Sequence, residues 1–529
     1  VGLNLVNLGG SLSVNGGAIS GVSAGGGLVS GGTGTIAIAS PVTSAAAHSV
    51  TVTGRSGGSV TFSGAITDTG TGVLLTNNAG SAVAFTGGLS LTTGANDAFV
   101  ATGGGTVTVT QDNVTIVNTI VTVEGAALRV TNTDIGAAGL TFRAISSGSA
   151  VTSTGNGIVL DTTGLLAANG GLTVTGNGTA TSGGRIRRKT GADNLLTEGI
   201  GIYLNATKPV SLSWMEINDT ANGGIVGRNL AGLSLLNSTL GGTHGSNAAL
   251  DEGPIVLGTR GNAGVNGVTG TLVLTDTVIE GGTRNNVSSF SHSGSLAVTL
   301  SGTAPEACQV LNNSTVSGEH GVLVESDGTA TVTVTVATCR VRNHRLGGLV
   351  ATAADTASLT LNVSNSEFVR STQGDEGIVT RNSGDAQLTS TITNTQFYDF
   401  SGAAIRVGQA AGNASALSLL RATIVGNSIQ QQPGSTTHAI LAELASTAGQ
   451  AARARILVDG NAVVTGGVNA GIGVRTFDAT AATEADVTIV NNHIDMLDTV
   501  NGLVGLLVNV SQPGINLCAN VSSNTSHFY

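Results

Sequence analysis

Charged residues make up only 10% of this 529-residue chain, and aromatic residues only 3%. So few rings limit any core that would be built from large side chains. Proline occurs only 6 times and the 80 glycines follow no Gly-X-Y period, which excludes a collagen helix. No apolar run is long enough for a membrane-spanning helix, which needs about 18 residues or more.

Cysteine is equally scarce, with Cys308, Cys339 and Cys518 as the whole set. Three cysteines do not make a disulfide framework, and without a CxxC motif or paired histidines they match no zinc pattern. Cys308 and Cys339 fall near neighbouring repeats, so they form either a disulfide or two free thiols. Cys518 follows an apolar residue, and we expect it to be a buried free thiol.

The residues that are present favour strands. Valine, isoleucine, leucine and alanine supply most of the 40% hydrophobic content, with threonine plentiful around them. A mean hydropathy of +0.28 argues against disorder, which needs low hydrophobicity and high charge. A net charge of −10 and an isoelectric point near 5.2 disfavour nucleic-acid binding, because phosphate neutralisation needs a basic face.

One pattern repeats along the chain. "LTLNVSNSEF" (Leu359–Phe368) returns as "LTSTITNTQF" (Leu388–Phe397), with alternating apolar residues, a polar residue and a later apolar residue. Alternation at period two places the apolar set on one face of a strand. The polar residue then breaks the strand, since Asn, Asp and Gly tolerate left-handed backbone. The predicted turn residues are Asn237, Asp276, Thr338, Asn365, Asn394, Arg421, Gly460 and Asn491, and Phe368 and Phe397 form a predicted ring stack.

The N-terminal part repeats with a shorter step, since "VTFSGAI" (Val60–Ile66) returns as "VAFTGGL" (Val83–Leu89). We therefore expect two continuous parts, a solenoid of short irregular coils over residues 1–200 and one of longer regular coils over residues 201–529. Helical repeats are excluded because no 3.6-residue period occurs, and the leucine-rich line is missing. The sequence predicts an all-β fold, a single-stranded right-handed parallel β-helix of the pectate-lyase-like type, with roughly 18–20 coils.

The segment "GIVTRNSGDAQLTSTITNTQF" resembles the parallel β-helix segments of very large bacterial surface and secreted proteins. The stretch that begins at Val60 looks like the region preceding these segments, and "INLCANVSSNT" is similar to their last coil. The resemblance implies a structural or adhesive rod of an extracellular or cell-surface assembly, as a filament or matrix subunit, within a longer polypeptide. A surface glycan or a protein is the ligand that such a role implies.

Enzymes also use this fold, so a carbohydrate-active enzyme is the alternative, and a receptor-binding spike is a further one. Fragments of a polygalacturonase-like motif occur at Asn132–Asp134, Gly318–Gly321 and Arg340–Arg342, but no Asp-Asp pair accompanies them. Glycosidic hydrolysis needs two carboxyl groups about 5–9.5 Å apart. We therefore expect no catalytic residues.

Two acidic clusters are the densest lyase candidates, and we interpret both as solvated loops: Asp251 and Glu252 with Arg260, and Asp375 and Glu376 with Arg381. In one predicted column of outward residues, neighbours on successive coils are either neutral or opposite in charge. The column consists of Glu325, Thr352, Arg381, Gly408, Glu443 and Arg475. The eight histidines are scattered without HExxH or HxH, so we expect neither a metal nor a cofactor.

The two ends are apolar or aromatic and carry no lysine or acidic residue to prevent strand pairing. We expect them to be covered, either by flanking parts of a longer polypeptide or by end-to-end self-association through Val1 and Tyr529. A head-to-tail contact of this kind propagates without closing.

Overall fold

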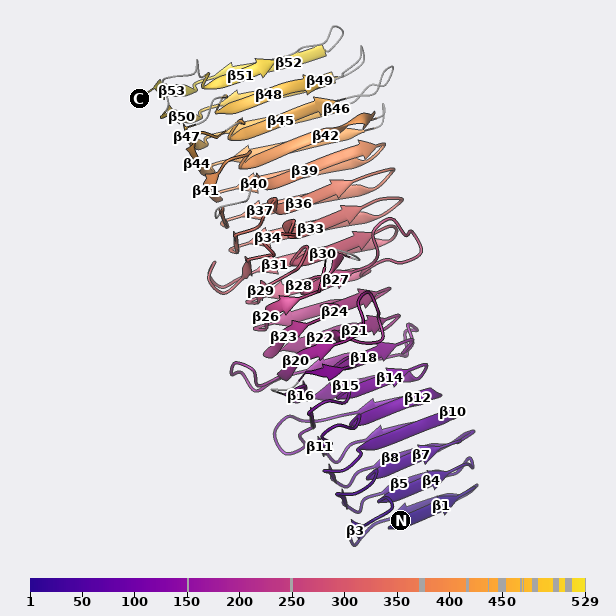
Figure 1. Ribbon diagram of the computed structural model, residues 1–529. Coiled ribbons are helices and arrows are strands. Elements are labelled where there is room, and N and C mark those ends of the chain that lie inside the picture. The colour runs from indigo at the N-terminus through magenta and orange to yellow at the C-terminus, as the bar shows by residue number, and fades with distance from the viewer. Residues whose placement is uncertain are drawn as a thin grey trace. The chain divides into compact units, whose positions relative to one another are not determined.

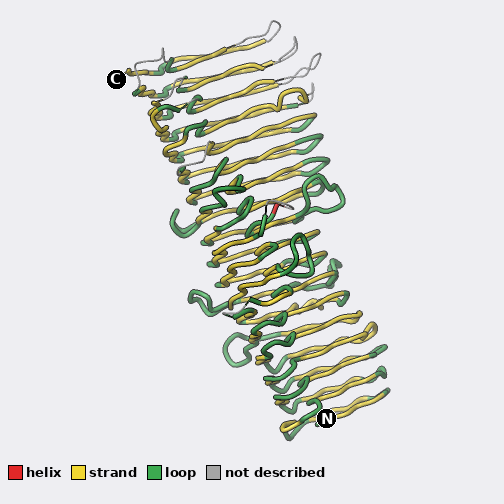
Figure 2. The backbone as a smooth tube through the Cα atoms, in the orientation of Figure 1, coloured by secondary structure: helices red, strands yellow, loops and turns green. Residues whose placement is uncertain are grey.

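The computed structural model describes residues 1–149, 152–247, 251–370, 376–414, 418–435, 437–445, 453–466, 469, 471–477, 484–497, 504–509 and 516–528. The chain divides into two compact units, Val1–Leu257 (unit 1) and Gly258–Tyr529 (unit 2). Each unit is a stack of coils, and most coils contribute one strand to each of three parallel ladders, which we call the first, second and third sheets (Figures 1 and 2). The first and second are parts of one continuous sheet, which the long strands β10 (Val73–Phe85) and β12 (Phe99–Val109) join in unit 1. Parallel pairing between successive coils confirms the predicted parallel β-helix.

In unit 1 the strands divide among the sheets as follows. The first sheet contains β1 (Leu3–Val6), β4 (Gly27–Ser30), β7 (Val50–Thr53), β10 (Val73–Phe85), β12 (Phe99–Val109), β14 (Leu128–Thr131), β18 (Ile158–Asp161), β21 (Ile200–Asn205), β24 (Gly223–Arg228) and β27 (Ile255–Leu257). The second contains β2 (Ser11–Val14), β5 (Thr35–Ile38), β8 (Ser59–Phe62), the later parts of β10 and β12, β15 (Asp134–Phe142), β19 (Leu172–Val174), β22 (Val210–Ser213) and β25 (Leu233–Leu236). The third contains β3 (Ile19–Val22), β6 (Val42–Ser44), β9 (Ile66–Asp68), β11 (Leu89–Thr92), β13 (Thr119–Thr122), β16 (Ala144–Ser147), β17 (Ser153–Thr154), β20 (Gly184–Thr190), β23 (Met215–Thr220) and β26 (Thr239–His244).

Unit 2 has the same three sheets. The first sheet contains β30 (Val287–Ser291), β33 (His320–Ser326), β36 (Gly347–Ala353), β39 (Glu376–Gly384), β42 (Ile405–Ala414), β45 (Ile440–Ala445), β48 (Ile472–Phe477) and β51 (Leu506–Asn509). The second contains β28 (Gly270–Thr275), β31 (Ser295–Ser301), β34 (Thr331–Ala337), β37 (Ser358–Ser364), β40 (Gln387–Thr393), β43 (Leu419–Val425), β46 (Arg453–Asp459), β49 (Glu484–Val490) and β52 (Asn516–Ser522). The third contains β29 (Val278–Glu280), β32 (Gln309–Leu311), β35 (Arg340–Arg342), β38 (Glu367–Val369), β41 (Gln396–Phe400), β44 (Ser428–Pro433), β47 (Ala462–Gly466), β50 (His493–Met496) and β53 (Thr525–Phe528).

The core follows from strand alternation. In β37 the side chains of Leu359, Leu361 and Val363 are buried, while the residues between them face outward. Leu359 pairs in register with Leu388, and Phe368 with Phe397 in the third sheet. Each inward residue therefore lies directly on its equivalent in the next coil, at the spacing of neighbouring strands, about 4.8 Å.

Rings stack in both units. Phe368 and Phe397 are fully buried, with ring centroids 5.3 Å apart and planes inclined by 17°. In unit 1 Phe62 and Phe85 stack in the same way at 5.1 Å. Offset stacking within this distance range adds to the free energy gained from burial.

The strand break after the second sheet uses left-handed backbone. Residues with positive φ at this corner include Trp214, Asn237, Asp276, Thr338, Asn365, Asn394, Gly426, Gly460, Asn491 and Ser523. The prediction of Arg421 as a turn residue is wrong, because Arg421 pairs with Thr389 inside β43 and Gly426 follows that strand instead. Two apolar residues before Arg421 match the repeat pattern, but they lie five positions ahead of those that precede the observed turn residue, Gly426.

The residue directly after most of these turns points inward and is polar. Ser366, Thr395, Asn427, Asn461 and Asn492 are all buried. Register places these side chains above one another, and we refer to Thr277, Cys308, Cys339, Ser366, Thr395, Asn427, Asn461, Asn492 and Asn524 as the corner column.

Asparagines in the corner column form a continuous ladder. The Oδ1 atom of Asn492 accepts hydrogen bonds from the backbone N–H and the Nδ2 of Asn461, at 3.0 and 2.9 Å. Asn427 donates to Asn461, and Asn492 donates to Asn524, in the same way. Each Nδ2 also reaches a backbone carbonyl, as Asn461 does at Ile424. The ladder thus satisfies buried backbone groups that the turn removes from the sheet.

The disulfide belongs to the same column. Cys308 and Cys339 are bonded to one another and occupy neighbouring coils directly before β32 and β35. Cys308 and Cys339 are both buried, and the N–H of Cys339 donates to the hydroxyl of Ser366. A covalent bond therefore replaces side-chain hydrogen bonding at this step of the corner column.

Cys518 is free and exposed, so the prediction of a buried thiol is wrong. It pairs with Asp486, which is an outward position of β49. The inward position is the neighbouring Leu517, which pairs with the buried Ala485. The prediction therefore assigned the cysteine to the inward face of the strand, which its apolar neighbour Leu517 occupies instead.

We expect Asn461→Leu to destabilise the protein by about 3 kcal/mol, since it leaves several buried hydrogen-bonding groups unpaired at about 1–3 kcal/mol each. The measurement is denaturant unfolding followed by circular dichroism. Asn394→Gly is the matched control, because Asn394 is exposed and its φ of 48° suits glycine. Equal unfolding midpoints for Asn461→Leu and the parent would contradict a stabilising role of the ladder.

Candidate functional site

Outward residues of the first sheet in unit 2 form a mixed-charge surface. Strand register aligns one column of residues across successive coils, namely Phe290, Glu325, Thr352, Arg381, Gly408, Glu443 and Arg475. The order matches the predicted alternation, in which no two like charges are direct neighbours. We refer to this column, together with Arg260, Glu376 and Arg406, as the charged face.

Glu443 is the most buried carboxylate of the charged face, with a side chain only 7% exposed. Its Oε2 accepts from Nε of Arg406 at 2.6 Å, and its Oε1 accepts from Arg475 at 2.5 Å. Burial alone would raise the pKa of Glu443, but the hydrogen bonds from Arg406 and Arg475 lower it below the ordinary value. Arg406 also donates to Glu376 at 2.7 Å.

Arg381 occupies the same column one coil before Gly408 and is half-buried. Burial lowers the pKa of its guanidinium, and the nearby charge of Arg406 lowers it further, against the attraction of Glu376 and Glu443. Within the described part of the chain, no hydrogen bond or ion pair joins Arg381 to a carboxylate. The guanidinium is therefore a desolvated cation whose five N–H donors are available to a ligand.

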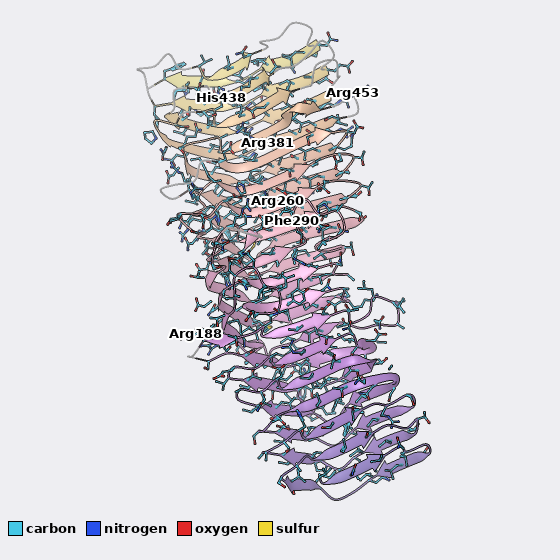
Figure 3. All side chains as sticks on the ribbon, turned by 45° about the vertical axis from the view of Figure 1, so that its right-hand side comes forward. Arg188, Arg260, Phe290, Arg381, His438 and Arg453 are labelled. Carbon is cyan, nitrogen blue, oxygen red and sulfur yellow. A yellow bond between two sulfur atoms is a disulfide. The ribbon has the colours of Figure 1, made fainter. Side chains whose placement is uncertain are left out.

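The other end of the charged face is anchored by an aromatic ring. The guanidinium of Arg260 lies 5.3 Å from the ring centroid of the buried Phe290 and 3.4 Å from a carboxylate oxygen of Glu325. Figure 3 shows Arg260, Phe290 and Arg381 on the same side of the sheet. Leu323, Val379 and Leu441 are buried residues of the adjacent outward column, which also contains Arg406, and they lie beside these charges on the same face of the sheet.

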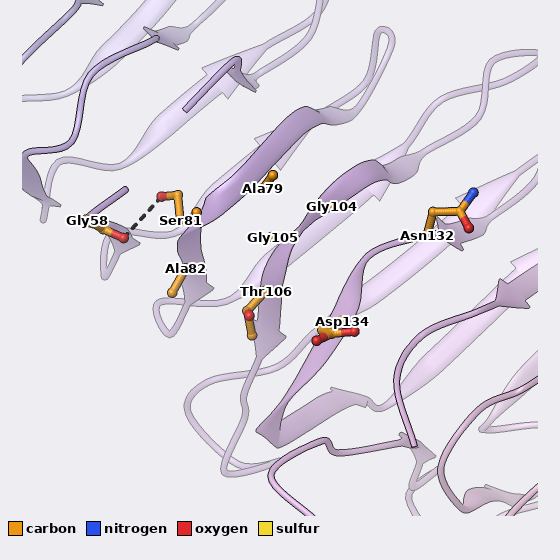
Figure 4. A pocket seen from close by; sticks show the side chains of 10 residues that line it. Gly58, Ala79, Ser81, Ala82, Gly104, Gly105, Thr106, Asn132 and Asp134 are labelled. Carbon is orange, nitrogen blue, oxygen red and sulfur yellow. Dashed lines mark hydrogen bonds between the residues drawn. The ribbon is translucent and has the colours of Figure 1, made fainter. Parts of the chain in front are cut away.

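Two of the sequence fragments that resemble a hydrolase motif can be described by their neighbours in the structure. Asn132 and Asp134 line an open hollow in unit 1 together with small residues of β10 and β12 (Figure 4). Asn132 is left-handed, and Asp134 is the one carboxylate among the residues that line this hollow. In unit 2, Arg340 forms ion pairs with Glu306 and Glu367.

The two acidic clusters differ from the predicted solvated loops. Asp251 and Glu252 are buried, which contradicts that interpretation, and the Glu252 carboxylate accepts from the N–H groups of Ser246 and Asn247. Burial raises the pKa of Glu252, with the two backbone hydrogen bonds acting against it. Asp375 lies outside the described residues, and Glu376 belongs to the charged face. The polar composition around Asp251 and Glu252 concealed their burial.

Three histidines lie inside the solenoid or against it. Burial lowers the pKa of His244, His320 and His344 to about 4 in each case. The Nε2 atom of His344 lies 3.0 Å from the carbonyl of Val310, and the ring is buried. Neutral imidazoles of this kind serve packing at neutral pH.

At the ends of the chain, Val1 is exposed and Tyr529 lies outside the described residues. The described residues include no helix that combines the length and apolar character needed to cross a membrane. The sequence matches no protein-family model, and neither a curated protein nor a solved structure matches it. The functional interpretation therefore depends on the surfaces described above.

Buried histidines predict acid sensitivity. Between pH 6.5 and about 4 the unfolded chain binds protons at these histidines that the folded chain does not, so stability falls as pH falls through this window. His344→Gln keeps a donor for Val310 and removes one titrating ring. We expect its unfolding free energy to vary less with pH, by up to about 1.4 kcal/mol per pH unit, than that of the parent. Urea unfolding at several pH values tests this, with His48→Gln as the control, and an unchanged pH dependence would contradict it.

We expect Glu443→Gln to destabilise the protein by about 3 kcal/mol, because it removes a buried carboxylate between two arginines. The matched control is Glu484→Gln, since Glu484 and Arg453 are both 66% exposed and 3.9 Å apart. An exposed pair of this kind contributes about 0–1 kcal/mol. Thermal unfolding of both variants measures the two losses of stability. Equal losses would contradict a stabilising role of the buried ion pairs of Glu443.

Proposed function

We propose that this chain is a structural and adhesive segment of an extracellular or cell-surface assembly, in which the solenoid supports a ligand-binding surface. The observation that carries the proposal is the charged face, where strand register holds the half-buried Arg381 and Arg406 in adjacent columns of successive coils and Arg475 two coils further on. Such an arrangement needs the solenoid to fix it, because the charges come from segments far apart in sequence. The resemblance of the repeats to bacterial surface proteins agrees with this role.

The disulfide supports an extracellular location. Disulfides persist in oxidising compartments and are rare in the reducing cytosol. The bond between Cys308 and Cys339 joins neighbouring coils inside the corner column, where both residues are buried. Burial of both sulfurs fits a structural bond that lasts through the life of the protein.

The charges point to the class of ligand. Arg381 is desolvated, and a carboxylate or sulfate group would supply the hydrogen bonds that burial has removed. Arg406 follows on the next coil and Arg475 three coils after Arg381, both paired with Glu443, so arginines recur along the direction in which coils stack. A linear acidic polysaccharide matches this distribution, since it presents one anionic group after another.

The test is isothermal titration with polygalacturonate, a linear polyuronate, against an uncharged polysaccharide of similar length. We expect binding of the polyuronate that weakens at least tenfold in Arg381→Ala and falls with added salt. Arg453→Ala is the control, because Arg453 forms a long, exposed ion pair on the second sheet. Equal affinity in both variants would contradict the proposed site.

The same samples distinguish the enzymatic alternative. Chromatography of the polysaccharide after incubation shows whether its chain length has changed. An adhesive role predicts unchanged length, whereas shorter or unsaturated products would establish a carbohydrate-active enzyme and overturn the proposal.

A further inference from the structure

Two histidines and an aspartate meet on the outer face of the third sheet in unit 2. His493 and Asp495 are outward residues of β50, two positions apart on one strand. The next coil pairs Thr525 with His493 and His527 with Asp495, so register places these four residues at neighbouring positions of β50 and β53. Figure 1 shows the two strands on adjacent coils. On the preceding coil the paired residues are Ala462 and Val464, which offer no competing charge.

The distances within this group suit a single ion. The Oδ1 atom of Asp495 lies 3.2 Å from Nε2 of His493 and 3.3 Å from Nδ1 of His527. One ligand atom from each residue lies within 4.8 Å of the other two. Tetrahedral coordination with bonds of about 2.0–2.1 Å separates ligand atoms by about 3.3 Å, so the two measured edges already have the required length.

A neighbouring hydroxyl orients one of the imidazoles. The Oγ1 atom of Thr525 lies 2.8 Å from Nδ1 of His493. This hydrogen bond holds the ring with Nε2 toward Asp495, as residues around metal sites commonly do for a ligating histidine. The His493 and His527 rings meet edge to face, with centroids 4.9 Å apart.

We propose that His493, Asp495 and His527 bind one divalent first-row transition metal ion, with Zn²⁺, Co²⁺, Ni²⁺ and Cu²⁺ as the candidates. The two imidazoles favour these ions, which also accept a carboxylate as a third ligand, whereas Ca²⁺ and Mg²⁺ need more oxygen ligands. The side chains of His493 and His527 are 47% and 52% exposed, and that of Asp495 is 22% exposed. The remaining coordination positions therefore face solvent, where water or a donor from a partner completes the shell.

The experiment uses the full chain after dialysis against a chelator, titrated with Co²⁺ and followed by visible absorption, with Zn²⁺ competition. We expect one equivalent to bind, with absorption bands of a low-symmetry site that Zn²⁺ abolishes. His493→Ala, Asp495→Asn and His527→Ala should each weaken Co²⁺ binding at least tenfold. His48→Ala, which removes a histidine from unit 1, should leave binding unchanged.

All three substitutions lie on the outer face, and circular dichroism verifies that each variant is folded. Electron paramagnetic resonance of the parent with one equivalent of Cu²⁺ gives an independent readout that needs no variant. Hyperfine structure from two imidazole nitrogens supports the site. Absence of such coupling, or Co²⁺ binding that the three substitutions leave unchanged, overturns it.

Discussion

Stacking of coils in unit 2 depends on the buried polar residue that follows each left-handed turn. At this corner the chain leaves the second sheet, and its backbone groups lose their partners in the ladder of strands. The corner column supplies replacements from the neighbouring coil at Asn427, Asn461 and Asn492, whereas at Cys308 and Cys339 a disulfide joins the two coils covalently. Because each of these contacts joins adjacent coils, they also fix the register of the coils.

Fixed register in turn creates the surfaces. Inward residues stack into apolar columns, and the alternate residues must then stack on the outside. Outward columns place Arg381, Glu443 and Arg475 on the charged face, and His493, Asp495 and His527 on the third sheet. Neither group is local in sequence, and a slip of one residue at the corner would disperse both.

The sequence allowed the fold to be predicted because its strongest signal is periodic. Alternation in Leu359–Phe368 and its repeat identified the second sheet, the turn and the ring stack, and the alternating charge column was visible as well. Third-sheet strands escaped prediction because most are only three to six residues long. Strands this short contain too few residues to show an alternation of apolar and polar side chains.

Prediction of buried residues and of the metal-site cluster failed where the outcome depends on which face of a strand a residue occupies or on loops of variable length. Asn492 lies directly beside the expected turn residue Asn491, and only register shows that the second asparagine forms the ladder. His527 reaches Asp495 from the next coil, 32 residues later in the sequence, so no short spacing rule such as HxH could find the group. Cys518 and Glu252 were misjudged for the same reason, since composition does not reveal which face a residue occupies.

Hydrogen–deuterium exchange at the corner column tests most directly whether it holds the coils together. The backbone N–H groups of Asn427, Asn461 and Asn492 donate to side chains of the following coil and not to a strand. The account predicts that these amides exchange as slowly as those inside β43 and β46, because both exchange only when the coils separate. Exchange as fast as that of unbonded loop amides would contradict it.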